Sequence, residues 1–334
     1  MSGKKLTAAL VLASIAGVAQ AQSLQELYER AKTEKALNLM GAGPAQNYEG
    51  LARAFEQQFP GIKVSITGGF SNELNGKIEA QAAAKKFETD MAVFQTVQDF
   101  VKWKKDGILA PFKPDGFDVI DPKFKDEDGA FVALYVSTVS YAYNSKDVAA
   151  ADVPKSALDF LHPRFKGKLV TVYPHDDDAA LYLFDTLVRK YGWDYMTRYM
   201  AQEPKFIQGH LGVARDVASG AALATFDATV STVGGQKRAG QPIELAFSEA
   251  DLTPVFFVTA GLFRDSPNPN AAKLYLTWLL AKEQQGRSGF FSPRADMPPP
   301  AGLKPLSSYN TANDYRAFRS EEHTSELQSR GLIS

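Results

Sequence analysis

The chain has 334 residues, of which 45% are hydrophobic and 22% charged, with 37 Lys and Arg against 38 Asp and Glu. A formal net charge of −1 gives no reason to expect nucleic acid or an anionic membrane surface as a partner. The composition is that of a soluble globular protein rather than a membrane-embedded or disordered one. The chain contains no cysteine, which excludes disulfides and a lipid-modified cysteine anchor. Its length exceeds one ordinary core, so we expect two lobes.

The N-terminus has the pattern of an export signal. Lys4 and Lys5 precede an apolar run over residues 6–19, and Ala19-Gln20-Ala21 is a cleavage pattern. The run is too short to predict a membrane span. We therefore expect residues 1–21 to be a signal peptide, cleaved after Ala21, that exports the protein to a bacterial periplasm.

The C-terminus has a different character. Residues 319–334 begin with Arg-Ser-Glu-Glu-His-Thr-Ser-Glu-Leu and resemble the translation of a common sequencing-library adapter. They carry no helical or strand periodicity that joins them to the preceding chain. We interpret this segment as read-through, with the natural chain cut off near Phe318; the alternative is a genuine polar tail.

The first elements form one βαβ unit. An amphipathic helix over residues 25–35 leads into a short apolar strand at 37–40. The loop Gly41-Ala42-Gly43, a helix over 44–58 and a second strand at 62–66 follow. A helix N-terminus carries unpaired N–H groups and a partial positive charge, so this loop could hold an anion or a carbonyl oxygen. The alternative is that the two glycines only make a tight turn.

Two more strand-to-helix junctions follow. The segment 68–72 precedes a helix that extends to about residue 85, and a strand at 90–94 leads through Gln95 and Thr96 into a helix over 97–105. If the sheet is parallel, all three junctions meet at one edge, where ligands of such sheets bind. The candidate ligand-binding residues of this lobe are Gly41, Ala42, Gly43, Phe70, Ser71, Asn72, Gln95 and Thr96.

A long, uninterrupted β-rich run over residues 133–144 predicts a strand that leaves the first lobe and enters a second. Ser137 within this run is a further candidate ligand contact. Two later runs, 243–247 and 255–262, are interpreted as strands that return to the first lobe, and a helix over 271–282 follows them.

The second lobe repeats the opening pattern, with a strand at 169–173, a short loop and a helix over 179–191. The loop reads His175-Asp176-Asp177-Asp178. Acidic residues in the first turn of a helix cap it and complement its dipole, and three adjacent residues cannot all face one ion. We expect Asp176 or Asp177 to turn toward a donor group of the ligand; a metal site is the alternative.

Another loop of the second lobe, residues 208–212, precedes a helix over 213–219, and a strand at 222–226 ends at Asp227. His210 and Asp227 therefore lie at junctions of the same kind as those of the first lobe. We include both among the candidate ligand contacts.

Four segments carry a family resemblance: Phe55-x-x-x-Phe59-Pro60-Gly61-Ile62-Lys63-Val64, Leu161-His162-Pro163-Arg164-Phe165-Lys166-Gly167-Lys168, Tyr191-Gly192-Trp193, and Pro267-Asn268-Pro269-Asn270-Ala271-Ala272-Lys273. They resemble the periplasmic solute-binding proteins of ABC importers. The most similar branch is the extracellular family that includes ferric-iron, phosphonate and sugar-phosphate binders. The resemblance runs in the same order over about residues 24–305.

This resemblance implies an α/β fold of the type II periplasmic binding protein class, in which two lobes joined by two crossing strands close like a hinge on a ligand in the cleft between them. The first lobe would comprise residues 22–136 and 248–318, and the second 137–247. The resemblance also implies a monomer that carries a small molecule to an inner-membrane ABC permease through a transient contact. Such a protein needs no cofactor and is not an enzyme.

Ferric iron is one ligand that the resemblance allows. Iron-binding relatives use two adjacent tyrosines just after the strand that ends here near Phe226, where this chain reads Phe226-Asp227-Ala228-Thr229-Val230, and only Glu73 could be carried over as an acidic ligand. Because Fe³⁺ needs several hard anionic oxygens, we disfavour iron and predict no metal ligands. We predict a small organic anion or phosphate-bearing solute, held mostly by backbone N–H groups and side-chain donors; Arg215 could add a bidentate contact.

An exported enzyme that acts on a small anion is the alternative from another class. The sequence contains no G-x-S-x-G, no H-E-x-x-H, no cysteine nucleophile and no P-loop lysine. Its four histidines are not grouped. A third interpretation is a protein whose closed form is recognised by a chemoreceptor rather than by a permease, and the sequence does not separate these two partners.

Overall fold

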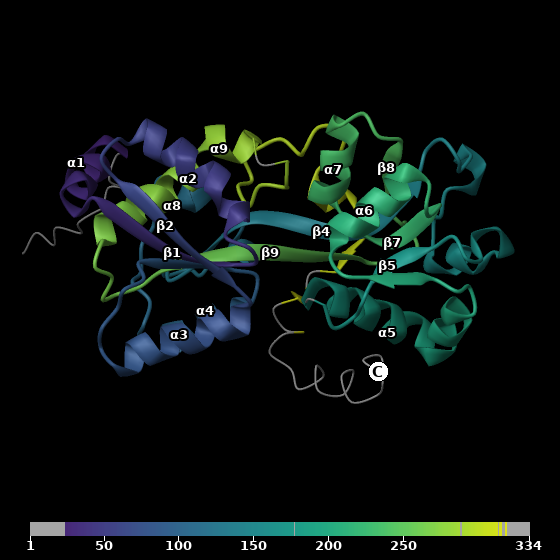
Figure 1. Cartoon of the computed structure of the whole chain (residues 1–334), viewed down its shortest axis with the longest axis horizontal. Helices are drawn as coiled ribbons and strands as arrows, with labels where there is room; N and C mark the ends of the chain where they lie inside the picture. The colour runs from purple at the N-terminus through teal and green to yellow at the C-terminus, as the bar shows by residue number, and fades with distance from the viewer. Residues whose placement is uncertain (1–23, 177, 288, 313, 316–317, 319–334) are drawn as a thin grey trace, which may run out of the picture.

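The computed structural model describes residues 24–176, 178–287, 289–312, 314–315 and 318. The predicted signal peptide, Asp177 and the segment 319–334 lie outside the described residues. The chain folds into two α/β lobes joined by long strands (Figure 1). Among the described residues, no helix is both long and apolar enough to cross a membrane.

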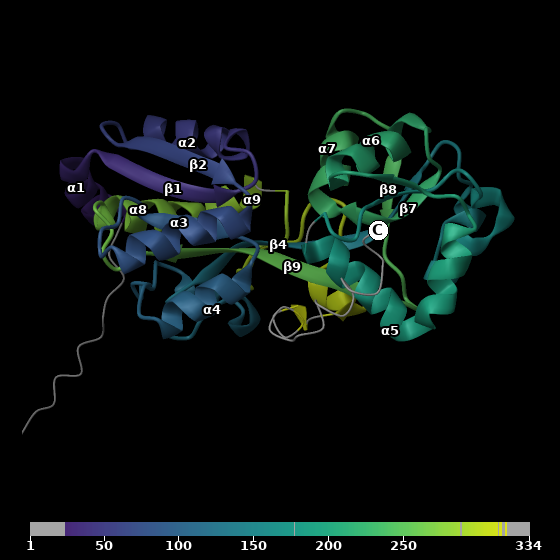
Figure 2. The ribbon, with the colours of Figure 1, turned by 60° about the horizontal axis from the view of Figure 1, so that its bottom comes forward.

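Lobe 1 is built on parallel strands, as the sequence predicts. Strand β1 (Ala36–Ala42) lies between β2 (Lys63–Gly69) and β3 (Met91–Phe94) and pairs in parallel with both. Figures 1 and 2 show α2 on one side of β1 and β2, and α3 and α4 on the other. The helices of this lobe are α1 (Leu24–Glu34), α2 (Gln46–Gln58), α3 (Ser71–Ala83), α4 (Val97–Lys105), α8 (Pro269–Leu280) and α9 (Lys282–Arg287).

The hydrophobic cores of lobe 1 lie on both faces of this sheet. On the α2 side, the ring of Phe55 packs edge-on against Tyr275 at 4.8 Å and Trp278 at 5.4 Å between ring centroids. On the α4 side, Phe100 and Trp103 are fully buried and pack against each other at 5.0 Å. Because both faces are covered, the open side of the sheet for a ligand is its carboxyl edge.

Two long antiparallel strands cross from lobe 1 to lobe 2. The first half of β4 (Val132–Asn144) pairs with β9 (Thr253–Leu262), and its second half pairs with β7 (Ala224–Thr229) and β8 (Ile243–Ala246). The main strand order is therefore β2-β1-β3-β9-β4-β7. The two predicted crossing strands are confirmed. Strand β8 is a correction, because it pairs with the lobe 2 end of β4 instead of returning to lobe 1.

Lobe 2 places its helices around the far end of β4. Its helix α5 runs over Asp178–Met200, longer than predicted, since the chain passes through Gly192 at φ 73° and continues as a second helical stretch. The further elements of this lobe are β5 (Val170–Val172), β6 (Lys205–Ile207), α6 (His210–Ser219) and α7 (Val230–Arg238). Short 3₁₀ helices occupy Phe117–Val119, Pro122–Phe124, Ala150–Asp152, Ala157–Leu161, Pro163–Phe165 and Leu306–Ser308.

The C-terminal segment runs back along the crossing strands. Strand β10 (Thr311–Ala312) pairs in parallel with β9. Asp314 then accepts a hydrogen bond from Tyr182 and pairs with Arg189 at 3.3 Å, both on α5. The predicted lobe boundary gives this segment to lobe 1, and its contacts are with β9 and with α5 of lobe 2.

Candidate functional site

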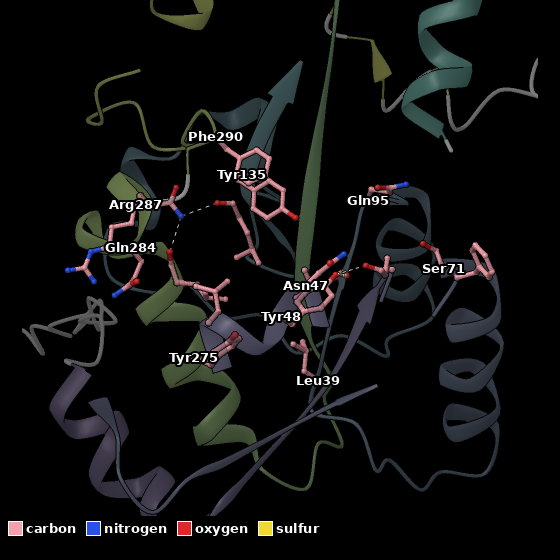
Figure 3. A pocket seen from close by; sticks show the side chains of 18 residues that line it. Leu39, Asn47, Tyr48, Ser71, Gln95, Tyr135, Tyr275, Gln284, Arg287 and Phe290 are labelled. Carbon is pink, nitrogen blue, oxygen red and sulfur yellow. Dashed lines mark hydrogen bonds between the residues drawn. The ribbon is translucent and has the colours of Figure 1, made fainter. Parts of the chain in front are cut away.

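A cavity of 760 Å³ lies at the carboxyl edge of the lobe 1 sheet, where β1, β2 and β3 end (Figure 3). Helix α8, strand β4 and the segment after α9 close its other sides. It is lined by Leu39, Ala42, Gly43, Asn47, Tyr48, Leu51, Phe70, Ser71, Val93, Gln95, Leu134, Tyr135, Tyr275, Leu279, Gln284, Gln285, Arg287 and Phe290. The three predicted strand-to-helix junctions of lobe 1 thus meet at one cavity.

Five of the predicted lobe 1 residues line this cavity, namely Ala42, Gly43, Phe70, Ser71 and Gln95. Phe70 caps the start of α3 and is 73% exposed, which is unusual for a phenylalanine and places an apolar ring at the rim. Ser71 and Gln95 are half-buried and present a hydroxyl and an amide to the same space. These two side chains are the predicted donors that lie at the cavity wall.

Gly41, Asn72 and Thr96 do not line the cavity. Gly41 is buried under the ring of Tyr48. A Cβ at Gly41 would lie 2.5 Å from that ring, so only glycine leaves room for it. The Thr96 hydroxyl donates to the Asp99 carboxylate at 2.5 Å and is nearly buried. The Asn72 side-chain oxygen accepts the N–H of Glu73 at 2.9 Å. Each of these three residues, which we expected to face a ligand, is instead engaged in packing or in a hydrogen bond within its own lobe.

The backbone of the first glycine loop is also engaged by the protein itself. The Gly43 N–H donates to the Gly69 carbonyl at 2.8 Å, and the Gly69 N–H donates back to the Gly43 carbonyl at 2.9 Å. Gly43 has φ 90°, a conformation that favours glycine. The tight-turn interpretation therefore accounts for the hydrogen bond of the Gly43 N–H.

Aromatic side chains that sequence analysis missed form much of the cavity wall. Tyr135 and Phe290 stack with ring centroids 4.2 Å apart and an interplanar angle of 22°. Tyr48 donates its hydroxyl to the Ala42 carbonyl at 2.7 Å, which ties α2 to the end of β1. Burial raises the pKa of Tyr135 to about 12, and burial also raises the pKa of Tyr48. Both phenols are therefore protonated at neutral pH.

The charge around the cavity is one-sided. Among the described residues that line it, none is Asp or Glu, and Arg287 is the charged one. Arg287 is 70% exposed and pairs with Glu283 at 2.9 Å, one turn earlier in α9. A second cavity, of 720 Å³, shares Gln285, Arg287 and Phe290 with the first and reaches α7 and β8 of lobe 2. There Lys237 and Arg238 add positive charge, while Glu244 pairs with Lys237.

The predicted residues of lobe 2 gather in a separate cluster. Asp227 is fully buried and accepts hydrogen bonds from the Thr171 hydroxyl at 2.9 Å and the Val172 N–H at 2.8 Å. Its other oxygen lies 3.1 Å from His210 Nδ1. Asp176 accepts the Gly209 N–H at 2.6 Å. These carboxylates hold the ends of β5 and the start of α6, and they do not line the 760 Å³ cavity.

The structure also bears on Ser137 and on the possibility of a metal site. Ser137 is fully buried within β4 and does not line the 760 Å³ cavity. Within the described part of the chain, no group of three or more His, Cys, Asp or Glu side chains could hold a metal ion. The region after β7, where iron-binding relatives were expected to carry tyrosines, reads Val-Ser-Thr-Val-Gly-Gly from Val230.

The family follows from a comparison with known proteins. A model of the bacterial extracellular solute-binding protein family matches residues 50–304. The chain belongs to this family. Binding a solute is therefore its function, and the family resemblance stated from the sequence is confirmed.

Individual relatives of this solute-binding protein are distant. The probable ABC transporter periplasmic-binding protein y4fP of Sinorhizobium fredii is 25% identical over 150 residues, which cover 42% of this chain and 41% of y4fP. The match thus spans less than half of either protein.

Solved structures cover almost the whole described chain. Iron-bound HitA from Pseudomonas aeruginosa has a TM-score of 0.70 at 20% identity, over 89% of this chain and 99% of that one. AfuA from Actinobacillus pleuropneumoniae, solved with fructose-6-phosphate, has a TM-score of 0.70 at 19% identity, over 89% of this chain and 97% of that one. The predicted two-lobe periplasmic binding protein fold is therefore confirmed.

Proposed function

We propose that this solute-binding protein captures a small organic anion in the periplasm and delivers it to an inner-membrane ABC permease. The protein acts as a monomer that docks transiently on the permease. The proposed relation to an ABC transporter is supported by the family and by the similarity to y4fP, a probable ABC transporter periplasmic-binding protein. The predicted export signal supports the location.

The anionic character of the solute rests on the charge around the 760 Å³ cavity. Arg287 lies at its wall, Lys237 and Arg238 line the adjoining cavity, and no carboxylate is among the described lining residues of the first. Ser71 and Gln95 add neutral donors. A hydrogen bond to a charged group contributes roughly 1.5–3 kcal/mol, so a few of them, less the cost of association, give an affinity on the order of micromolar.

A cation such as Fe³⁺ fits this cavity less well. Hard cations bind to several anionic oxygens, whereas the cavity offers phenols whose pKa is raised by burial, Tyr48 and Tyr135. The acidic side chains Asp176 and Asp227 are committed to backbone and hydroxyl donors of lobe 2. This supports the anion over the iron alternative.

The crossing strands suggest how binding is signalled. Strands β4 and β9 are continuous through both lobes, so a small rotation about them would bring lobe 2 over the cavity. A solute that contacts both lobes stabilises the closed form, which the permease recognises. Small-angle scattering of the protein with its bound solute should show a smaller radius of gyration; unchanged dimensions would contradict closure.

Calorimetric titration tests the proposed solute class. The purified protein is titrated with carboxylates, phosphates and phosphonates, and in parallel with Fe³⁺ and neutral sugars. We expect heat from at least one anion class, with an affinity that falls as salt rises. Heat from Fe³⁺ or a neutral sugar alone would overturn the proposal.

A further inference from the structure

We propose that the solute carries a flat aromatic ring, and that the stacked pair Tyr135 and Phe290 forms the surface on which this ring packs. This inference rests on the proposed capture of an anion and adds the chemical class of the anion's body.

The ring pair is held in place by the protein. The bridge between β4 and the segment after α9 consists of two hydrogen bonds, from the Val136 N–H to the Phe291 carbonyl at 2.8 Å and from the Phe291 N–H to the Val136 carbonyl at 3.1 Å. Tyr135 and Phe290 immediately precede the two bridged residues. Each ring is only partly buried although the flanking residues Leu134, Val136 and Phe291 are buried. The pair is therefore a rigid aromatic wall with one side open to the cavity.

The rest of the wall is also suited to an apolar ring. Leu39, Val93, Leu134 and Leu279 are buried side chains that line the same 760 Å³ space, which is large enough for a substituted ring. Figure 3 shows the rings of Tyr135 and Phe290 together, with the Tyr135 hydroxyl directed away from Phe290. Aromatic rings prefer such offset-stacked or edge contacts, which stabilise beyond simple burial.

A sugar-like solute matches this wall poorly. Beside the ring pair, the polar side chain of Gln285 is already bound: its amide donates to the Leu134 carbonyl at 2.9 Å and the Leu279 carbonyl at 2.8 Å. Its oxygen accepts the Ser292 hydroxyl at 2.7 Å. A ring with a hydroxyl on each carbon would place some hydroxyls against the apolar side chains Leu134 and Leu279, where they have no partner, and this costs binding free energy.

The anionic group of such a solute has a defined direction. Arg287 lies three residues before Phe290 and lines the same cavity, and Phe290 also lines the adjoining cavity that Arg238 of α7 reaches. A carboxylate or phosphate on such a ring could reach Arg238 across the adjoining cavity and Arg287, which also pairs with Glu283. The aromatic body contacts lobe 1, and the charge is placed where lobe 2 can contact it.

The test compares aromatic anions with saturated anions of the same size. The purified full chain is titrated calorimetrically with benzoate, phthalate and phenyl phosphate, each against its cyclohexane counterpart, and with fructose-6-phosphate. We expect an aromatic anion to bind about three- to tenfold tighter than its saturated counterpart, the range that stacking provides. Phe290→Leu and Tyr135→Leu should remove this preference, while Tyr135→Phe should keep it.

A ring pair on the outer side of lobe 1 provides the control. Tyr28 packs against Phe59 at 5.2 Å and donates to the Pro60 carbonyl, away from the cavity. Tyr28→Leu should leave the aromatic preference unchanged, and thermal unfolding of each variant shows whether it is folded. If Phe290→Leu does not fold, Tyr135→Leu with Tyr135→Phe decides the question.

The outcomes separate this inference from the proposed function. Equal or tighter binding of saturated anions or of fructose-6-phosphate, unaffected by Tyr135→Leu and Phe290→Leu, would overturn the aromatic class and leave anion capture standing. Silence from every anion would overturn both. If aromatic anions bind more tightly and the two leucine variants do not reduce this preference, another surface contacts the ring. That result would overturn the assignment to Tyr135 and Phe290.

Discussion

The carboxyl edges of the two lobes are built from the same strand, loop and helix units, yet they present different chemistry. In lobe 1, Ser71 and Gln95 stand at the wall of an aromatic cavity that has no carboxylate among its described lining residues. In lobe 2, Asp176 and Asp227 accept hydrogen bonds from neighbouring segments of the same lobe, Gly209 before α6 and Thr171 and Val172 of β5. The same architecture can therefore open a binding surface or use its polar groups to hold itself together. Substitutions at the two edges distinguish these two roles.

The largest effect is expected at Gly68, behind the lobe 1 cavity. A Cβ there would lie 2.4 Å from the Ala45 nitrogen and 2.7 Å from the Gly43 oxygen, both backbone atoms that cannot rotate away. Gly68→Ala should lower the free energy of unfolding by about 2–3 kcal/mol and weaken solute binding, because the loop at the cavity wall must shift. Denaturant unfolding and calorimetry measure the two effects.

Gly50 in α2 is the matched control for Gly68. A Cβ at Gly50 would meet nothing within 4 Å. Gly50→Ala should leave binding unchanged and raise the free energy of unfolding by up to about 1 kcal/mol. Equal behaviour of the two variants would show that the loop contact at Gly68 does not shape the cavity.

The next largest effect tests whether the lobe 2 cluster around Asp227 stabilises the fold or binds the solute. Asp227→Asn replaces an acceptor that takes two donors, Thr171 and Val172, in a buried site. We expect about 2 kcal/mol less stability and little change in solute affinity. Asp216→Asn, which breaks only a surface pair with Lys205, should cost less than about 1 kcal/mol. Loss of binding without loss of stability in Asp227→Asn would place this cluster at the solute.

The dependence of stability on pH is expected to involve Asp251, which lies where the chain passes from lobe 2 into β9. Burial alone would raise the pKa of Asp251, but the Lys190 ammonium, the hydroxyls of Tyr141 and Tyr191 and the Ala157 N–H outweigh burial and lower it. A carboxyl whose folded pKa is lowered contributes stability above its unfolded pKa and loses it as pH falls toward the folded value.

Asp251→Asn should therefore cost about 1–2 kcal/mol at pH 7 and flatten the fall in stability below about pH 4. Urea unfolding across that range measures both. The exposed Asp128 is the control: its hydrogen bond with Lys104 at 2.7 Å also lowers its pKa, but water screens this pair, so Asp128→Asn should change the pH profile far less than Asp251→Asn. An unchanged profile in Asp251→Asn would show that this carboxylate does not govern acid stability.

The smallest effect is expected at the lobe 1 wall itself. Ser71 is half-buried at the start of α3, so Ser71→Ala should leave unfolding unchanged and weaken solute binding about fivefold, the loss of one hydrogen bond. Ser65→Ala on the same strand and loop unit, at an exposed position outside the cavity, should change neither property. Equal affinities for wild type and Ser71→Ala would remove this hydroxyl from the site.

The sequence identified the parts of the fold whose signals are local. Apolar runs, glycine loops and helical spacing located β1, α2 and α4, and the uninterrupted run at 133–144 located the crossing strand. The side on which β8 pairs was mispredicted, because an apolar run does not say which end of β4 it joins. The junctions at Ser71 and Gln95 were found at the cavity because parallel strands end at one edge.

The remaining features of the site depend on contacts between distant segments. Tyr135 and Phe290 become neighbours only when the chain after α9 pairs with β4, and neither residue has a sequence signal of its own. Gly41 was interpreted as a ligand contact, whereas its role follows from the Tyr48 ring that packs on it. Sequence patterns thus predicted the edge of the sheet at which the cavity lies, and tertiary packing decides which side chains line it.

Native mass spectrometry of the protein purified from a periplasmic extract tests the central claim most directly. The account predicts a complex that releases one small molecule bearing a carboxylate or phosphate, and a lower occupancy of that molecule in Ser71→Ala. Release of a ferric ion or a neutral sugar instead would contradict it.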